Sequence, residues 1–318
     1  MFAGIVGAHC IDREQPLPGG TVVASVAAMA DAFPCPAKVT MSKRTSGSNH
    51  ILFAAAVFLL CVAVRVLDVF VVRSDEWIGE QVLTKVLGLA IVLAYVIWSG
   101  FGLARLGFRR PSMASTLGVG VGLTVAVMAA TFALQFFVLA AQGQAPQFIV
   151  GVEGFAIGDQ PDGGVGTGPA IGLISFNLVN ALMEESLFRG LLITHVAMAM
   201  SAMRANIIQA VLFGLWHIVW PIRAVVDGDM SIDAAMVYST GFVLVSTIMG
   251  FVWGCFFIWF RSLWVPIIAH TIHNAALNVF HITTISGAST VAFFTTAEAV
   301  LFLALLPAVY WWKRRLDA

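Results

Sequence analysis

The sequence predicts an all-α, polytopic membrane protein: a helix bundle with about eight transmembrane helices. Of its 318 residues, 59% are hydrophobic and only 11% are charged, and the mean hydropathy is +0.92. Soluble domains carry roughly 25% charged residues, so a composition this apolar indicates a protein that is embedded in lipid. The formal net charge of zero argues against nucleic acid as a partner. The partners that we expect are therefore the lipid bilayer and a membrane-associated substrate.

Residues 1–47 differ from the rest of the chain, because they are rich in proline and glycine and contain no membrane-spanning run. We expect a disordered tail here. The apolar stretch Thr21–Phe33 is short and lacks a basic segment before it, which argues against a cleaved signal peptide. Met41, which lies just before Lys43 and Arg44, is an alternative start of the chain.

A series of apolar runs follows the tail, and the fifth and seventh of them are the shortest. The predicted spans are Ile51–Val72, Val82–Phe108, Thr116–Ala141, Ala170–Thr194, Ala205–Trp220, Ala234–Phe260, Trp264–Ile282 and Val291–Trp312. The four cysteines are scattered without CxxC spacing, so they predict neither a disulfide framework nor a thiolate zinc site. Cys61 and Cys255 lie in apolar runs and are predicted to be small core residues.

Basic residues predict the orientation of these spans. With an even number of spans, most basic residues outside them fall on one side: Lys43, Arg44, Arg105, Arg109, Arg110, Arg204, Arg261, Lys313, Arg314 and Arg315. The opposite loops hold mainly Arg73, Lys85, Arg223 and the acidic, glycine-rich stretch 151–168. Both termini are therefore predicted to be cytoplasmic, in a multi-pass protein that we expect in the bacterial plasma membrane.

Two adjacent carboxylates, Glu184 and Glu185, lie in the fourth span. An ionisable group in the bilayer centre costs at least about 2.5–3.5 kcal/mol, so such groups are usually paired or functional. Glu185 and Arg189 are four residues apart with the acid first, which predicts an ion pair within the helix. The side chain of Glu184 is rotated by about 100° around the helix axis from that of Glu185, so it lies on the helix face that carries Asn180 and Asn177. The alternative interpretation is that both carboxylates are neutralised packing groups at a helix end.

The fifth span carries Phe213 and His217 on one face, and Gly214 allows a neighbouring helix to approach closely. A single histidine in a membrane helix is more often an interhelical hydrogen-bonding group than a catalyst. The seventh span places His270 and Asn274 on one face, with His273 beside it.

Two acids, two or three histidines and an asparagine on three spans could form one polar pocket. Such a pocket could bind a metal through carboxylate and imidazole groups. It could equally activate a water by general base catalysis, with an asparagine and a histidine as donors to an oxyanion.

At these positions the sequence resembles a known family. Glu184-Glu-Ser-Leu-Phe-Arg189, Phe213-Gly-Leu-Trp-His217 and His270-Thr-Ile-His-Asn274 match, in order, the EExxxR, FxxxH and HxxxN motifs of the CPBP family. These are the CAAX-protease and bacteriocin-processing (Abi) intramembrane proteases, related to the type II CAAX prenyl endopeptidase. The resemblance implies a catalytic helix core in 170–282, with accessory helices in 48–168, a final helix in 291–312 and a basic tail in 313–318.

The resemblance implies a role for each motif residue. Glu184 would activate the attacking water with help from His217, and His270 and Asn274 would stabilise the oxyanion. Glu185, Arg189 and Phe213 would support Glu184. A divalent metal, zinc by family convention, would be held by Glu184, His217 and His270. The same residues also fit a metal-free, glutamate-dependent mechanism, because they lack the HExxH spacing of a zinc helix.

Two other function classes compete with the protease. One is a non-proteolytic membrane regulator or scaffold with the same fold, against which the complete motif set argues. The other is an ion or proton-coupled transporter, because intramembrane carboxylates and histidines also mark ion paths. The sequence lacks the paired inverted repeats that many such transporters show. If the protein is a protease, the sequence does not distinguish between three substrate classes: prenylated CAAX proteins, bacteriocin leaders and membrane regulators.

The remaining polar membrane residues have simpler interpretations. Arg65 and Asp68 are predicted to form a local pair, and Lys85 and Glu298 to extend to the outer interface. Interfacial positions are also expected for His195, His281, Trp216, Trp220, Trp264, Trp311 and Trp312.

Overall fold

Helices make up nearly all of the described chain in this computed structural model, which confirms the predicted all-α polytopic class. The structure describes residues 47–78, 80–151, 167–285 and 290–317, and all of these lie in one unit, Lys43–Ala318. The predicted tail lies almost wholly outside the described residues, as does most of the acidic stretch 151–168.

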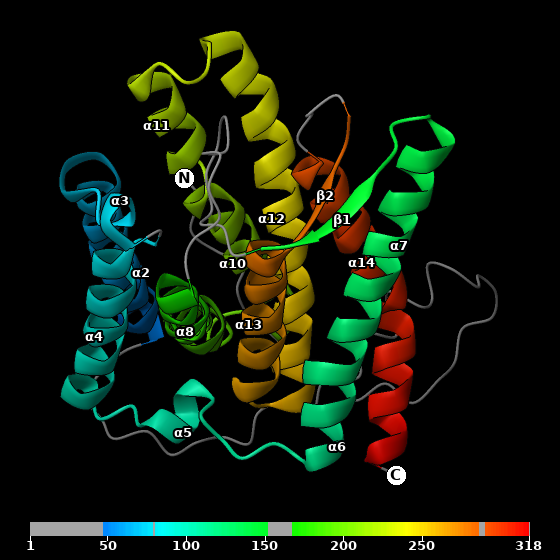
Figure 1. The fold of residues 1–318 in the computed structure, drawn as a ribbon. Coiled ribbons are helices and arrows are strands. Elements are labelled where there is room, and N and C mark those ends of the chain that lie inside the picture. Colours follow the sequence, from blue (N-terminus) through cyan, green and yellow to red (C-terminus); the bar gives the residue numbers. More distant parts are fainter. Residues whose placement is uncertain (1–46, 79, 152–166, 286–289, 318) are drawn as a thin grey trace, which may run out of the picture. The chain divides into compact units, whose positions relative to one another are not determined.

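The elements follow the predicted order along the chain (Figure 1). They are α2 (Gly47–Leu67), η1 (Asp68–Val72), α3 (Asp75–Ile78), α4 (Val82–Ser99), α5 (Leu103–Leu106), α6 (Met113–Ser115), η2 (Thr116–Leu123), α7 (Thr124–Ala141), β1 (Gln147–Val150), α8 (Thr167–Glu185), η3 (Ser186–Ile193), α9 (Thr194–Val196), α10 (Ala202–Trp216), α11 (Val219–Asp227), α12 (Ile232–Phe260), α13 (Trp264–Val279), β2 (Phe280–Thr283) and α14 (Val291–Leu316). The elements η1, η2 and η3 are π-helical and continue the helices beside them.

Six helical segments within the described ranges are long and apolar enough to cross a membrane. They are His50–Val72, Val82–Ser99, Met113–Ala141, Ala202–Asp227, Ile232–Phe260 and Val291–Leu316. The two other predicted spans are also helical, but α13 has only 16 residues and α8 continues into η3 with three ionisable residues between Glu184 and Arg189. The two segments that fall short of a simple span therefore carry two of the three polar motifs, and the motif at Phe213 and His217 lies in the span Ala202–Asp227.

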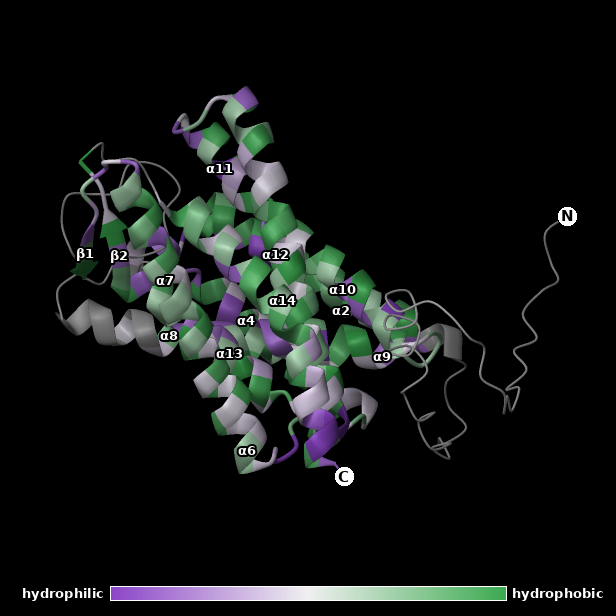
Figure 2. Cartoon of the chain, turned by 90° about the vertical axis from the view of Figure 1, so that its right-hand side faces the viewer, coloured by the Kyte–Doolittle hydropathy of each residue, from purple (hydrophilic) through white to green (hydrophobic). Residues whose placement is uncertain are grey.

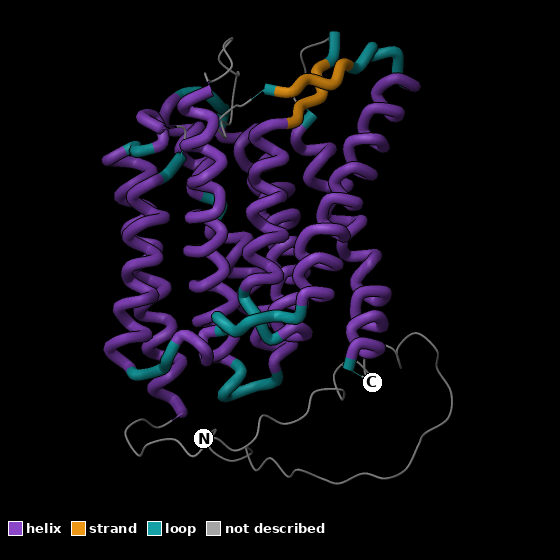
Figure 3. The backbone as a smooth tube through the Cα atoms, turned by 60° about the horizontal axis from the view of Figure 1, so that its bottom comes forward, coloured by secondary structure: helices purple, strands orange, loops and turns teal. Residues whose placement is uncertain are grey.

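Two predicted helix ends are wrong. Helix α4 ends at Ser99 rather than Phe108, because Gly100 adopts a left-handed conformation (φ 65°) that caps the helix. Helix α13 ends at Val279, and the next residues form β2, which pairs antiparallel with β1 in the register Gln147↔Thr283 (Figure 3). The sequence prediction missed this antiparallel pair because its strands are far apart in the chain and the residues of β2 are as apolar as the helix before them.

Packing brings the motif helices together. Helix α8 packs against α4 and α13, while η3 packs against α10 and α12. Helices α10 and α12 are in the most extensive contact, and a Cβ on Gly214 would overlap the side chain of Thr247 and lie 2.6 Å from the carbonyl oxygen of Val243. The predicted close approach at Gly214 is thus confirmed, and it sets His217 at the edge of the same helix pair.

Different contacts join the segments at the two ends of the bundle (Figure 1). At one end the loop after α5 meets the loop after α12, where Leu263 N–H donates to the carbonyl of Gly107 (2.8 Å) and Ser262 Oγ–H to that of Arg109 (2.7 Å). At the other end Arg223 bonds to Asp75, Glu76 and Asp227. The cytoplasmic side remains a prediction from the basic residues.

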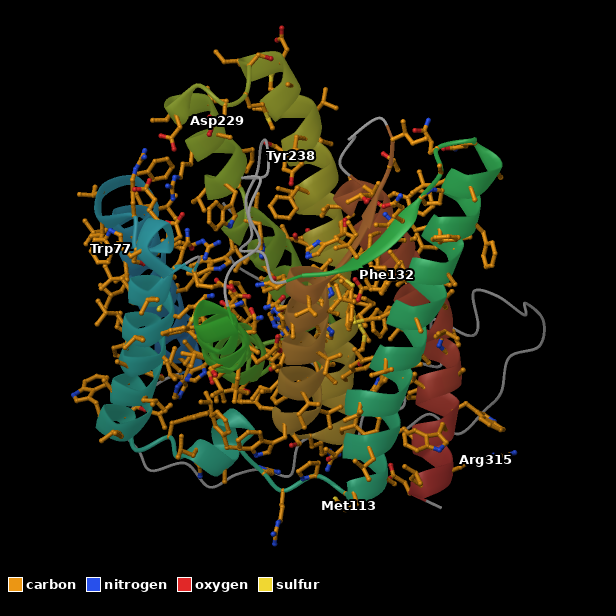
Figure 4. All side chains as sticks on the ribbon, viewed as in Figure 1. Trp77, Met113, Phe132, Asp229, Tyr238 and Arg315 are labelled. Atoms are coloured by element: carbon orange, nitrogen blue, oxygen red, sulfur yellow. The ribbon has the colours of Figure 1, made fainter. Side chains whose placement is uncertain are left out.

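The outer surface is apolar along the helices, and polar colour gathers towards the C-terminal end of α14 (Figure 2). Trp77 and Met113, both 72% exposed, point away from the bundle (Figure 4). Cys61 and Cys255 are free and buried, as predicted.

Several polar residues predicted to lie at interfaces are instead buried. Lys85 pairs with Glu80, and the fully buried Glu298 accepts a hydrogen bond from His273 Nδ1 (2.9 Å). His195 is fully buried, with its Nε2 atom 2.8 Å from the hydroxyl of Tyr95. Lys85 pairs with the loop just before its own helix, whereas Glu298 and His195 have partners on other helices, which hydropathy along one segment does not reveal.

The predicted Arg65–Asp68 pair is also wrong. Asp68 accepts hydrogen bonds from Ser74 Oγ and from the backbone N–H of Thr84, each at 2.6 Å. This carboxylate therefore joins the end of α2 to the start of α4. The guanidinium of Arg65 lies elsewhere, over the ring of Trp216.

Candidate active site

The two adjacent glutamates lie at the junction of α8 and η3, where the helix widens into π-helical turns. Glu184 is 3% exposed, and Glu185 and Arg189 have no exposed surface. Wider turns of this kind are frequent at functional sites because they redirect side chains out of the regular helical register. Both carboxylates are therefore inside the bundle and need partners there.

Glu185 and Arg189 form the predicted ion pair. Arg189 Nη1 donates to Glu185 Oε1 (3.1 Å), and Nη2 donates to the carbonyl of Gly250 on α12 (3.1 Å). That same carbonyl accepts a hydrogen bond from Gln209 of α10 (2.9 Å). The guanidinium also lies 4.4 Å from the ring centroid of Phe213. Arg189 thus joins η3 to α10 and α12, a wider role than the predicted local pair.

His270 of α13 lies between the two glutamates. Its Nδ1 atom is 2.8 Å from Glu185 Oε1, and its Nε2 atom is 3.7 Å from Glu184 Oε2. The imidazole also stacks on the indole of Trp253, with ring centroids 4.3 Å apart and planes inclined by 20°. One oxygen of Glu185 therefore bonds both Arg189 and His270, which fixes the imidazole beside Glu184.

Trp216 is a site residue that sequence reasoning missed. It was expected at a membrane interface, but it is 3% exposed and its Nε1–H donates to Glu184 Oε1 (3.0 Å). Its ring packs edge-on against Phe188 (5.6 Å between centroids). Only its position next to His217 in the sequence could have indicated that Trp216 belongs to the site. The indole thus holds one oxygen of Glu184 and leaves the other facing His270.

His217 and Asn274 complete the predicted set. His217 follows the last residue of α10, and its Nδ1 atom lies 2.8 Å from the carbonyl oxygen of Phe213. Because a carbonyl only accepts, Nδ1 must carry the hydrogen, which leaves Nε2 of the neutral ring as a proton acceptor. Asn274 is half-buried one turn after His270 on α13. The described contacts join Glu184, Glu185, Arg189 and His270 directly, while His217 and Asn274 lie on the elements beside them.

The predicted zinc ligands do not form a complete set in this arrangement. A catalytic zinc needs about three protein ligands around one point. Within the described ranges, no group of three His, Cys, Asp or Glu side chains is placed to hold a metal ion. Glu184 and His270 approach each other, but one Glu184 oxygen is occupied by Trp216.

Comparison with known families places this site. Residues 166–276 match the family model described as "Type II CAAX prenyl endopeptidase Rce1-like". This segment contains all three motifs, so the match agrees with the family resemblance found in the sequence. No curated protein and no solved structure matches the chain significantly.

Proposed function

We propose that this protein, which belongs to the CAAX-type proteases through residues 166–276, is an intramembrane endopeptidase that hydrolyses a peptide bond of a membrane-associated substrate. The observation that carries the proposal is the placement of His270 between two buried carboxylates, one held by Arg189 and the other by Trp216. Packing alone does not require this arrangement, because four of its groups are ionisable and lie inside an apolar bundle.

Glu184 serves as the general base in this proposal. It takes a proton from a water molecule, and the water oxygen attacks the carbonyl carbon of the scissile peptide bond. The tetrahedral intermediate then collapses: the C–N bond breaks, and Glu184 returns the proton to the leaving nitrogen. The products are a carboxylate and an amine. Trp216 supports this role because its hydrogen bond orients the carboxylate.

His270 and Asn274 stabilise the negative charge on the carbonyl oxygen. His270 donates through Nδ1–H to the carboxylate of Glu185, and its Nε2 atom faces Glu184; once Nε2 takes up a proton, it can donate into the space beside Glu184. Asn274 adds an amide donor on the same helix face. His217 assists Glu184 as a second acceptor, since its Nδ1 hydrogen is committed to the Phe213 carbonyl.

The substrate is best identified by comparing membrane proteomes. Cells that express the wild type should accumulate cleaved fragments of specific membrane proteins or lipid-anchored peptides, and cells that express Glu184→Ala should not. Identical fragment patterns at equal expression would contradict the protease and favour a non-proteolytic regulator with the same fold.

Chelation tests the role of a metal. Because no group of three His, Cys, Asp or Glu side chains within the described ranges is placed to hold a metal ion, we expect purified protein to keep its turnover in a strong chelator such as phenanthroline. Elemental analysis of the same sample is the matched measurement. Two results would contradict this expectation: stoichiometric zinc that is lost in His270→Ala, and activity that a divalent ion restores after chelation. The protease assignment itself would still stand.

Trp216→Phe should lower kcat/KM by about 10- to 100-fold. The substitution removes the N–H donor to Glu184 but keeps an aromatic ring against Phe188. A hydrogen bond to a charged group contributes about 1.5–3 kcal/mol, and each 1.4 kcal/mol corresponds to a factor of ten. Steady-state kinetics of Trp216→Phe and of Trp311→Phe, which changes an exposed ring, provide the comparison. Equal loss in both variants would contradict the role of Trp216.

A further inference from the structure

Arg65 lies in the last turn of α2, outside the family-matched segment, yet it reaches the candidate active site. Its guanidinium carbon is 4.4 Å from the ring centroid of Trp216, on the face of the indole whose N–H holds Glu184. The residue is 5% exposed. A buried cation and the proposed general base therefore contact the same indole, one at its face and the other at its N–H.

Arg65 has no hydrogen-bond or ion-pair partner among the described residues, and its Nε atom is buried without an acceptor. The carboxylates whose charges act on it are those of Glu184, Asp68 and Glu80. Each bonds elsewhere: Glu184 to Trp216, Asp68 to Ser74 and Thr84, and Glu80 to Lys85.

A buried guanidinium that stacks on an aromatic face without an acceptor is costly, because its Nε–H has lost water without gaining a hydrogen bond. A cation–π contact offsets only part of that loss. Arg189, at the same site, shows the usual solution, with a carboxylate and a carbonyl as acceptors. Arg65 therefore has the features of a group that is completed by a ligand.

We propose that Arg65 binds a carboxylate of the peptide, beside Glu184. The inference rests on the proposed function for the identity of the ligand as a peptide. Planar guanidinium groups bind carboxylates through two parallel hydrogen bonds, which neutral amides cannot reproduce. The carboxylate has two sources: hydrolysis forms one on the N-terminal fragment, and a substrate can already carry one close to the scissile bond.

Binding is measured without cleavage, on full-length Glu184→Gln protein in detergent. The probes are N-acetyl-Leu-Leu with a free carboxylate and the same dipeptide as its C-terminal amide. We expect the acid to raise the unfolding temperature more than the amide does, and to bind about 10- to 100-fold more tightly. Adding Arg65→Met should abolish this difference, Arg65→Lys should keep part of it, and the exposed control Arg204→Met should keep all of it.

Thermal stability without a ligand separates a binding role from a structural one. Removal of an unpaired buried charge should keep or raise the unfolding temperature, so Arg65→Met should be at least as stable as its parent. Equal binding of acid and amide, or an acid preference that survives in Arg65→Met, would overturn the proposal. A marked loss of stability in Arg65→Met would also overturn it, because the guanidinium would then be a structural group.

The active wild type distinguishes the two carboxylate sources. If hydrolysis supplies the carboxylate, the N-terminal product should inhibit as an acid and not as an amide. If the substrate supplies it, a substrate peptide that ends in an acid should have a KM about 10- to 100-fold lower than its amide. A protein without protease activity that still prefers the acid through Arg65 would refute the proposed function and leave the carboxylate site standing.

Discussion

Glu184→Gln should lower kcat by about 100- to 10,000-fold while the unfolding temperature stays close to that of the wild type. Glutamine has the same size, and its carbonyl oxygen can still accept the hydrogen bond from Trp216. It cannot take a proton from water, so the chemical step loses its base. Turnover of a substrate peptide from the membrane comparison, measured beside thermal unfolding, tests this expectation.

The matched control for that experiment is Glu76→Gln. Glu76 lies near one end of the bundle, half exposed, and bonds to Arg73 and Arg223. Its substitution should leave kcat unchanged. Full turnover of Glu184→Gln would show that another group activates the water, and the roles of Trp216 and His270 beside it would then need a different explanation.

Arg189→Met should lower the free energy of unfolding by about 3–5 kcal/mol, because it leaves a buried carboxylate without its cation. Neither Glu185 nor Arg189 has exposed surface, and the guanidinium also donates to the carbonyl of Gly250. Arg189→Met should also lower enzymatic activity, because Glu185 is the hydrogen-bond partner that fixes His270. Chemical denaturation in detergent, with the helical signal as the readout, measures the change.

Arg204→Met is the control for the loss of an arginine as such, because Arg204 is exposed near the start of α10. It should change stability by less than about 0.5 kcal/mol. An Arg189→Met protein that is as stable and active as the control would contradict a supporting role for the ion pair. The expected contrast with Arg65→Met is informative, because Arg65 and Arg189 are both buried but only Arg189 has hydrogen-bond and ion-pair partners among the described residues.

Part of the candidate site could be predicted from the sequence because it is local in the chain. Glu185 and Arg189 are four residues apart, so any helix there brings them together, and the ion pair forms even within π-helical turns. The placement of His270 was predictable only through the order of the three motifs. Trp216 was predicted to be interfacial and Arg65 to pair locally with Asp68, since nothing in their own segments marks a partner on another helix.

The sequence by itself determined that this protein is a helical membrane bundle, where most of its helices lie, and which residues carry the motifs. Hydropathy and helical spacing are properties of one segment at a time, so one segment suffices to predict them. The tertiary structure decided that Trp216 holds Glu184 across 32 positions of the chain and that His270 meets Glu185 across 85. It also decided that Glu298 is buried against His273 and that Arg65 is left without an acceptor among the described residues. These contacts depend on how each helix is rotated and how deep it sits against its neighbours, and packing between helices sets both.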